Sequence, residues 1–79
     1  MDIKTLITVN EDIQGGQPVF AGTRVPVESL FDHLEAGVSL SEFLDDFPTV
    51  SREQAVAVLE VANKLLTSRN VAHWYAAVA

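Results

Sequence analysis

The residues that could take part in chemistry are few, and their spacing does not assemble a catalytic site. Asp45 and Asp46 are neighbouring carboxylates, but adjacent residues on a helix point in different directions, so they do not form an acid–base pair. The glycine pair at 15–16 is not followed by the Gly-Lys-Ser/Thr of a phosphate-binding loop, and no serine lies in a nucleophile elbow. His33 and His73 lie outside any cluster with metal-ligand spacing, and the chain has no cysteine. We therefore expect no enzyme activity, no metal and no cofactor.

One arginine stands among turn-forming and apolar residues in the run QPVFAGTRVPVESL, residues 17–30. A guanidinium at such a corner can donate to carbonyl groups at a helix end or to a nearby carboxylate. We predict that Arg24 is buried and hydrogen-bonded, and that it fixes the corner between an extended segment and the next helix. The alternative is that Arg24 is displayed, where it contacts phosphate or an acidic site on a partner.

Ser51, Arg52 and Gln54 are the side chains with which this chain could contact DNA. They begin a long predicted helix, which follows a short helix and the turn PTVS, the pattern of a helix-turn-helix unit. Arginine and glutamine can hydrogen-bond to base edges, although Glu53 between them opposes tight binding. An ordinary three-helix bundle fits the same spacing about as well.

The charge balance favours a protein partner over nucleic acid. The chain has 11 acidic and 5 basic residues, a formal net charge of −6. No Lys or Arg occurs between Val25 and Ser51, a stretch that holds six carboxylates: Glu28, Asp32, Glu35, Glu42, Asp45 and Asp46. Such a stretch repels phosphates and suits a basic protein surface.

The elements that position these residues begin with extended segments. Residues 3–9, IKTLITV, are rich in β-branched residues and predict a strand. We expect residues 4–9 to pair antiparallel with residues 17–21. Turns separate these segments. We expect the following residues to shape the turns and the corner that leads into the first helix: Gly15, Gly16, Pro18, Gly22, Thr23, Arg24 and Pro26.

Three helices follow, each with a start or stop signal. The first begins at Pro26, which suits a helix start, and ends at Gly37. The second begins after Ser39, which forms a capping box with Glu42, and Pro48 stops it. The third, from about residue 52 to residue 68, begins with a second capping box made by Ser51 and Gln54.

The third helix has an apolar stripe that is wider than a surface helix in a small domain needs. The stripe includes Val58, Val61 and Leu65, and the tail adds Trp74 and Tyr75, residue types typical of interface hot spots. Because a chain of 79 residues with 48% hydrophobic residues has a thin core, we predict that these five residues form a dimer or partner interface. The alternative is that the N-terminal strands or the tail itself cover the stripe.

The length and composition predict a single domain over residues 1–79. Residues 2–26 form strands and turns, residues 27–69 form the helical helix-turn-helix core, and residues 70–79 form an apolar C-terminal segment. No apolar stretch reaches the roughly 20 residues needed to cross a bilayer. The N-terminus lacks the basic flank and long apolar segment of a signal peptide, so we expect a cytoplasmic protein without membrane contact.

Four sequence pieces resemble a known family. They are the GG-x-P of Gly15, Gly16 and Pro18, the GTR-x-P-V of residues 22–27, then AGVSLSEFL and FPTVSREQ. Over about residues 9–65 the chain closely resembles the domain-of-unknown-function family 433, a group of small prokaryotic proteins. The resemblance implies a mainly α fold with a small N-terminal β element, in which a three-helix, homeodomain-like helix-turn-helix core is followed by a short C-terminal helix.

The same resemblance implies an antitoxin of a toxin–antitoxin pair, often encoded beside a PIN-like nuclease toxin. We therefore expect a homodimer that neutralises such a toxin by protein–protein binding and that binds its own operator DNA. The alternative is a helix-turn-helix transcription regulator without a toxin partner. No small-molecule substrate is expected.

Overall fold

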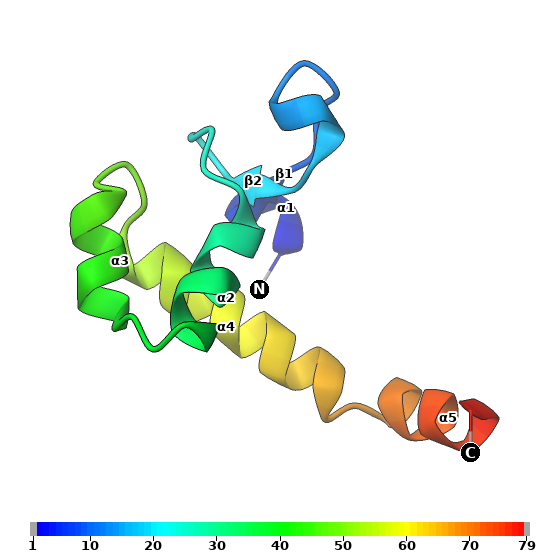
Figure 1. Ribbon diagram of the computed structural model, residues 1–79. Coiled ribbons are helices and arrows are strands. Elements are labelled where there is room, and N and C mark those ends of the chain that lie inside the picture. Colours follow the sequence, from blue (N-terminus) through cyan, green and yellow to red (C-terminus); the bar gives the residue numbers. More distant parts are fainter. Residues whose placement is uncertain (1, 79) are drawn as a thin grey trace.

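A computed structural model describes residues 2–78 of the chain (Figure 1). It is mainly helical, with a two-stranded sheet near the N-terminus, as predicted. In chain order the elements are α1 (Ile3–Leu6), β1 (Ile7–Thr8), the 3-10 helix η1 (Gln14–Gly16), β2 (Val19–Phe20), α2 (Val27–Glu35), α3 (Leu40–Asp46), α4 (Arg52–Leu66) and α5 (Arg69–Val78).

The N-terminal segment confirms the predicted pairing but not the predicted strand length. β1 and β2 pair antiparallel, with Ile7 opposite Phe20 and Thr8 opposite Val19. Residues 3–6 are helical, so the strand predicted over residues 3–9 is wrong in its first half. The physical reason is a local cap, because an Asp2 carboxylate oxygen accepts a hydrogen bond from the Lys4 N–H at 2.9 Å.

Aromatic side chains from β2 and α3 form the centre of the core. Phe20 and Phe43 are fully buried, with ring centroids 6.2 Å apart. Phe47 lies 4.9 Å from Phe43, and the edge of His33 packs against Phe43 at 5.3 Å. The other buried members of this cluster come from α2, the α3–α4 turn and α4: Leu30, Val50, Ala55 and Val58. Each of the three main helices therefore contributes to one core, together with β2.

The predicted helix caps form at α3 and α4. Ser39 Oγ accepts from the Glu42 N–H at 3.1 Å, and Ser51 Oγ accepts from the Gln54 N–H at 3.0 Å. α2 begins directly after Pro26, as predicted. α4 ends at Leu66, two residues before the predicted end, and a two-residue linker, Thr67–Ser68, leads into α5.

The C-terminal arm, residues 67–78, lies apart from the core. Figure 1 shows α5, coloured orange to red, beyond the end of α4 and away from α2, α3 and the sheet. Thr67 Oγ1 donates to the Asn63 carbonyl at 2.8 Å, and Ser68 Oγ donates to the Leu65 carbonyl at 2.9 Å. Both linker residues are thus tied to the last turn of α4, and no residue of α5 is buried.

Candidate interaction surfaces

The corner between β2 and α2 is closed by hydrogen bonds of the backbone and of one hydroxyl. The Phe20 N–H donates to the Val25 carbonyl at 2.9 Å, and the Val27 N–H donates to the Pro18 carbonyl at 3.0 Å. Within the turn that these two backbone hydrogen bonds close, Thr23 Oγ1 donates to the Phe20 carbonyl at 2.8 Å and accepts from the Val25 N–H at 3.0 Å. These bonds fix the direction in which α2 leaves the sheet.

Glycine and glutamine supply the turns on either side of this corner. Gly22 has φ = +78°, and Gly15 and Gly16 have φ of +66° and +89°, conformations that other residues adopt only with strain. Gln14, at φ = +51°, begins the turn that contains Gly15 and Gly16. Its Nε2 donates to the Arg24 carbonyl at 3.2 Å, so the two turns are joined to each other. The motif glycines therefore have a backbone role, as the sequence indicated.

Arg24 does not have the predicted role. Its side chain is exposed, and its guanidinium makes no hydrogen bond or ion pair with any of residues 2–78. The physical reason is that the Thr23 hydroxyl and the backbone already satisfy the corner, which leaves no acceptor there for an arginine. The prediction of a buried, locking guanidinium is wrong, and Arg24 is displayed to solvent.

The three residues predicted to contact DNA lie together at the start of α4, where each is used within the molecule. Ser51 caps the helix, and Arg52 Nη2 donates to Ser41 Oγ at 2.9 Å. Gln54 Nε2 donates to two backbone carbonyls, of Leu6 at 3.2 Å and of Ala21 at 3.0 Å. The half-buried Gln54 amide therefore holds α4 against the N-terminal segment, and its donors are used within the molecule instead of facing a partner.

The sequence contained a signal for this role of Gln54. Residues 54, 58, 61 and 65 follow one another at helical spacing, so Gln54 continues the row of Val58, Val61 and Leu65. A polar side chain in an apolar row points toward the interior, where it must find partners. The capping box of Ser51 and Gln54 forms only in part, because the Gln54 side chain turns to the Leu6 and Ala21 carbonyls.

The acidic residues of α2 and α3 are together called the acidic face. It consists of the six carboxylates predicted from the sequence, all of which are exposed: Glu28, Asp32, Glu35, Glu42, Asp45 and Asp46. Glu28 accepts a hydrogen bond from Gln17 Nε2 at 2.8 Å. The one ion pair among residues 2–78 lies elsewhere, between Lys64 and Glu60 at 3.4 Å on α4. None of the six carboxylates forms an ion pair among residues 2–78.

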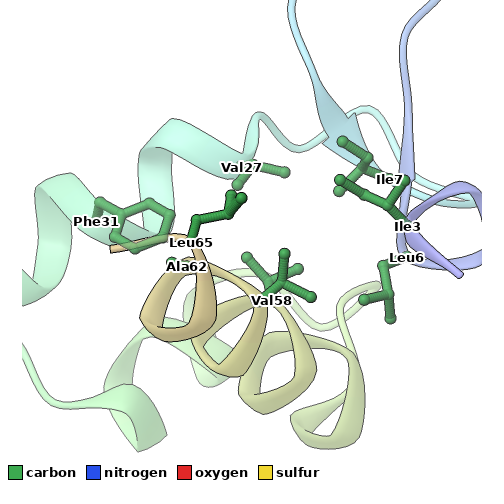
Figure 2. Close-up of a pocket in the computed structure, with 9 residues that line it drawn as sticks. Ile3, Leu6, Ile7, Val27, Phe31, Val58, Ala62 and Leu65 are labelled. Atoms are coloured by element: carbon green, nitrogen blue, oxygen red, sulfur yellow. The ribbon is translucent and has the colours of Figure 1, made fainter. Parts of the chain in front are cut away.

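An apolar groove of about 150 Å³ lies between α1, α2 and α4 (Figure 2). Figure 2 shows side chains of α2 on one side, side chains of α4 on the other and the N-terminal segment at one end. Every residue that lines it is apolar: Ile3, Leu6, Ile7, Val27, Phe31, Val58, Val61, Ala62 and Leu65.

The predicted interface residues divide between the core and the surface. Val58 is 7% exposed and belongs to the core, so its assignment to an interface is wrong. The reason is that the N-terminal segment covers this part of α4, which was the alternative left open by the sequence. Val61 is half-buried in the groove, whereas Leu65, Trp74 and Tyr75 are 55%, 60% and 74% exposed. The tail does not cover the stripe.

Residues 2–78 contain neither a metal-binding cluster nor a membrane-spanning helix. No three His, Cys, Asp or Glu side chains in that range lie close enough together to hold a metal ion. His33 Nδ1 instead donates to the Ser29 carbonyl at 2.6 Å, within its own helix. Every helix in the same range is too short or too polar to cross a lipid bilayer.

The chain matches a protein family along most of its length. The family described as "Protein of unknown function (DUF433)" matches residues 7–62, from β1 to the last turns of α4. The chain belongs to this family. The match includes the corner, the acidic face and the Gln54–Ala21 contact of the DUF433 chain, and it stops before α5.

A relative of the DUF433 chain is "Uncharacterized protein y4eO" of Sinorhizobium fredii (strain NBRC 101917 / NGR234). The two are 34% identical over 70 residues, which cover 86% of this chain and 32% of the relative. The DUF433 chain thus spans about a third of the length of that curated relative. No solved structure matches the chain.

Proposed function

We propose that this DUF433 chain is a cytoplasmic, non-enzymatic antitoxin that binds a basic nuclease toxin of the PIN-like kind through its acidic face. The observation that supports this most is the composition of α2 and α3, where six carboxylates are exposed and residues 25–51 contain no Lys or Arg. The corner between β2 and α2 holds this surface in a fixed position on the core.

The physical argument is electrostatic complementarity. A surface with one sign of charge attracts a partner of the opposite sign, which raises the association rate and excludes partners of like charge. A nuclease groove that holds nucleic-acid phosphates is basic for the same reason. An acidic protein face that covers such a groove competes directly with the nuclease substrate, which is sufficient for neutralisation.

Operator binding is the second activity in this proposal, and the α3–turn–α4 unit supports it. The turn of residues 47–51 joins two helices in the order of a helix-turn-helix motif, as in the homeodomain-like core that the family resemblance implies. Arg52 is exposed at the start of α4, although Ser41 accepts one of its hydrogen bonds. With Gln54 turned inward and a net charge of −6, we expect weak DNA binding by the chain alone and tighter binding with the toxin.

The antitoxin function can be tested with the product of the neighbouring open reading frame, co-expressed with the DUF433 chain. Asp45→Lys combined with Asp46→Lys should lower the association rate and restore nuclease activity. The matched control is Glu11→Lys with Asp12→Lys, which makes the same charge change on exposed residues outside the acidic face. Equal loss of binding in both variants, or no complex with the unaltered chain, would contradict the proposal.

The DNA activity is tested separately, by titration of promoter DNA at several salt concentrations. The isolated chain should bind weakly, with a shallow dependence on salt, because the logarithm of affinity falls by about 0.9 per phosphate neutralised. Tight binding by the isolated chain, with a steep salt dependence and no gain from the partner, would instead support a transcription regulator without a toxin.

A further inference from the structure

The chain carries an apolar groove and an apolar helix that does not occupy it. The groove lies between α1, α2 and α4, and α5 lies beyond the far end of α4 (Figures 1 and 2). We propose that the groove receives α5 of a second copy of this chain, so that two chains exchange their C-terminal helices in a homodimer. This pairing does not depend on the antitoxin function, and of the acidic face it involves only Glu28 and Glu35, which lie beside the groove residue Phe31.

The C-terminal arm needs a cover that its own chain does not provide. Trp74, Tyr75 and Val78 lie on one side of α5 by helical spacing, and Val78 is 85% exposed. Hydrogen bonds from Thr67 and Ser68 tie the linker to the last turn of α4, and α5 continues from there away from its own groove. A second molecule can therefore cover this apolar side without breaking the linker.

Exposed apolar side chains continue along α4 from the groove toward the linker. Leu65 lines the groove and is still 55% exposed, and the next residue, Leu66, is also exposed just before the linker. An arm from a partner that enters the groove at this end meets apolar side chains of α4, α2 and α1 in turn. Both contacts then belong to a single interface.

The area is of the order that a stable dimer requires. Each aromatic side chain buries about 150–250 Å² when it is covered completely, so Trp74 and Tyr75 together contribute roughly 200–330 Å² in proportion to their exposure. Further large apolar side chains are exposed on the same elements: Ile3, Leu65, Leu66 and Val78. By two-fold symmetry each chain gives one arm and accepts another, so its buried surface includes arm and groove. That total approaches the roughly 800 Å² per partner of a standard interface.

The charges also favour a second copy of the chain at the groove and oppose its binding through the acidic face. Residues 61–78 contain Lys64 and Arg69 and no acidic residue, although the whole chain carries −6. On α2, Glu28 and Glu35 are three and four residues from the groove residue Phe31 and flank it on the same side of the helix. Lys64 belongs to α4 and is paired with Glu60, so the arm itself brings one cation, Arg69, to the carboxylates at the edge of the partner's groove. Contacts through the acidic faces would instead bring like charges together.

Disulfide trapping tests which surfaces meet, because the chain has no cysteine of its own. One tagged variant carries Ile3→Cys in the groove, and a differently tagged variant carries Val78→Cys in the arm. Mild oxidation of the mixture should give a heterodimer that contains both tags. The control partner is Val56→Cys, which places an exposed cysteine on α4 outside the groove and should not be trapped.

The other occupants of the groove would appear as different products. A disulfide within one chain in the Ile3→Cys/Val78→Cys double variant would show that α5 folds back on its own groove. Trapping only between two Val78→Cys chains would show that the arms pair with each other and leave the groove empty. Either product, without the mixed heterodimer, overturns the proposal.

A solution measurement uses Trp74, the one tryptophan in the chain. Its emission should shift to shorter wavelength as the concentration rises through the micromolar range, together with a change in sedimentation from monomer to dimer. Tyr75→Asp should weaken the dimer at least tenfold, because charge is placed on the buried side of α5. Ala76→Asp places the same charge on the other side of α5, and it should leave the dissociation constant of the dimer within about twofold of the unaltered value. A monomer at every concentration, or equal weakening by both variants, overturns the proposal.

Discussion

The two halves of α4 have similar sequences and different surroundings. In the first half, Ala55 and Val58 are buried, and Gln54 is held by the backbone of the N-terminal segment. In the second half, Leu65 continues the row of Val58 and Val61 at helical spacing but remains exposed, as does Leu66. Apolar periodicity thus identifies a helix face that needs cover, but it does not identify the cover. For the first half the cover comes from distant parts of this chain, and for the second half we propose a second chain.

The largest expected difference is between removing an aromatic ring from the core and removing one from the C-terminal arm. Phe43→Ala should cost about 3–5 kcal/mol of unfolding free energy, because it leaves a cavity among the other core aromatics. Trp74→Ala should change the stability of the monomer by less than about 0.5 kcal/mol, since the side chain is 60% exposed on the arm.

Urea denaturation followed by circular dichroism measures both values, at protein concentrations low enough to keep the chain monomeric. Equal destabilisation by the two variants would show that α5 packs on its own core, and the comparison between the halves of α4 would fail.

A smaller effect tests how the first half of α4 is held. Gln54→Ala should cost about 1–3 kcal/mol, because the Leu6 and Ala21 carbonyls lose the amide to which they are bonded. Gln17→Ala removes a hydrogen bond of similar length to Glu28 at the surface, and it should cost less than about 0.5 kcal/mol. If both variants unfold at the same urea concentration, Gln54 is not what joins α4 to the N-terminal segment.

The smallest effect concerns the corner between β2 and α2, which attaches the N-terminal segment to the helices. Gly22→Ala should cost about 1 kcal/mol from φ = +78° alone, because no atom lies within 4 Å of the added methyl group. Arg24→Ala, two residues away, should stay within about 0.5 kcal/mol, since its side chain is exposed and without a partner among residues 2–78. Thermal unfolding of both variants gives the difference, and a larger loss for Arg24→Ala would restore the locking role that the structure does not show.

Local signals in the sequence were sufficient to predict most of the fold. The serine caps of α3 and α4 and the proline before α2 gave the helix starts, because each acts through residues no more than three positions away. The helix at residues 3–6 was missed because β-branched composition outweighed the single capping residue, Asp2. In so short a segment, one hydrogen-bonded cap and contact with α4 decide the structure.

The surfaces were predictable only where they depend on composition. The acidic face follows from a stretch without basic residues, since charged side chains stay in water wherever the helices carry them. The groove and the roles of Val58 and Arg24 depend instead on which distant segment lies beside α4 and on how the corner closes. Neither is encoded in local spacing, so the sequence left these assignments open or gave them incorrectly.

The contact of Gln54 also sets an order of events during synthesis. Its partners, the carbonyls of Leu6 and Ala21, precede it by 48 and 33 residues. At about 5–20 residues per second, the ribosome makes Gln54 several seconds after the sheet residues have been joined to the chain. For that interval the N-terminal hairpin has no helix to pack on, and two strands alone are marginally stable in water. The N-terminal hairpin, although made before α4, therefore reaches its final place only after Gln54 has been made.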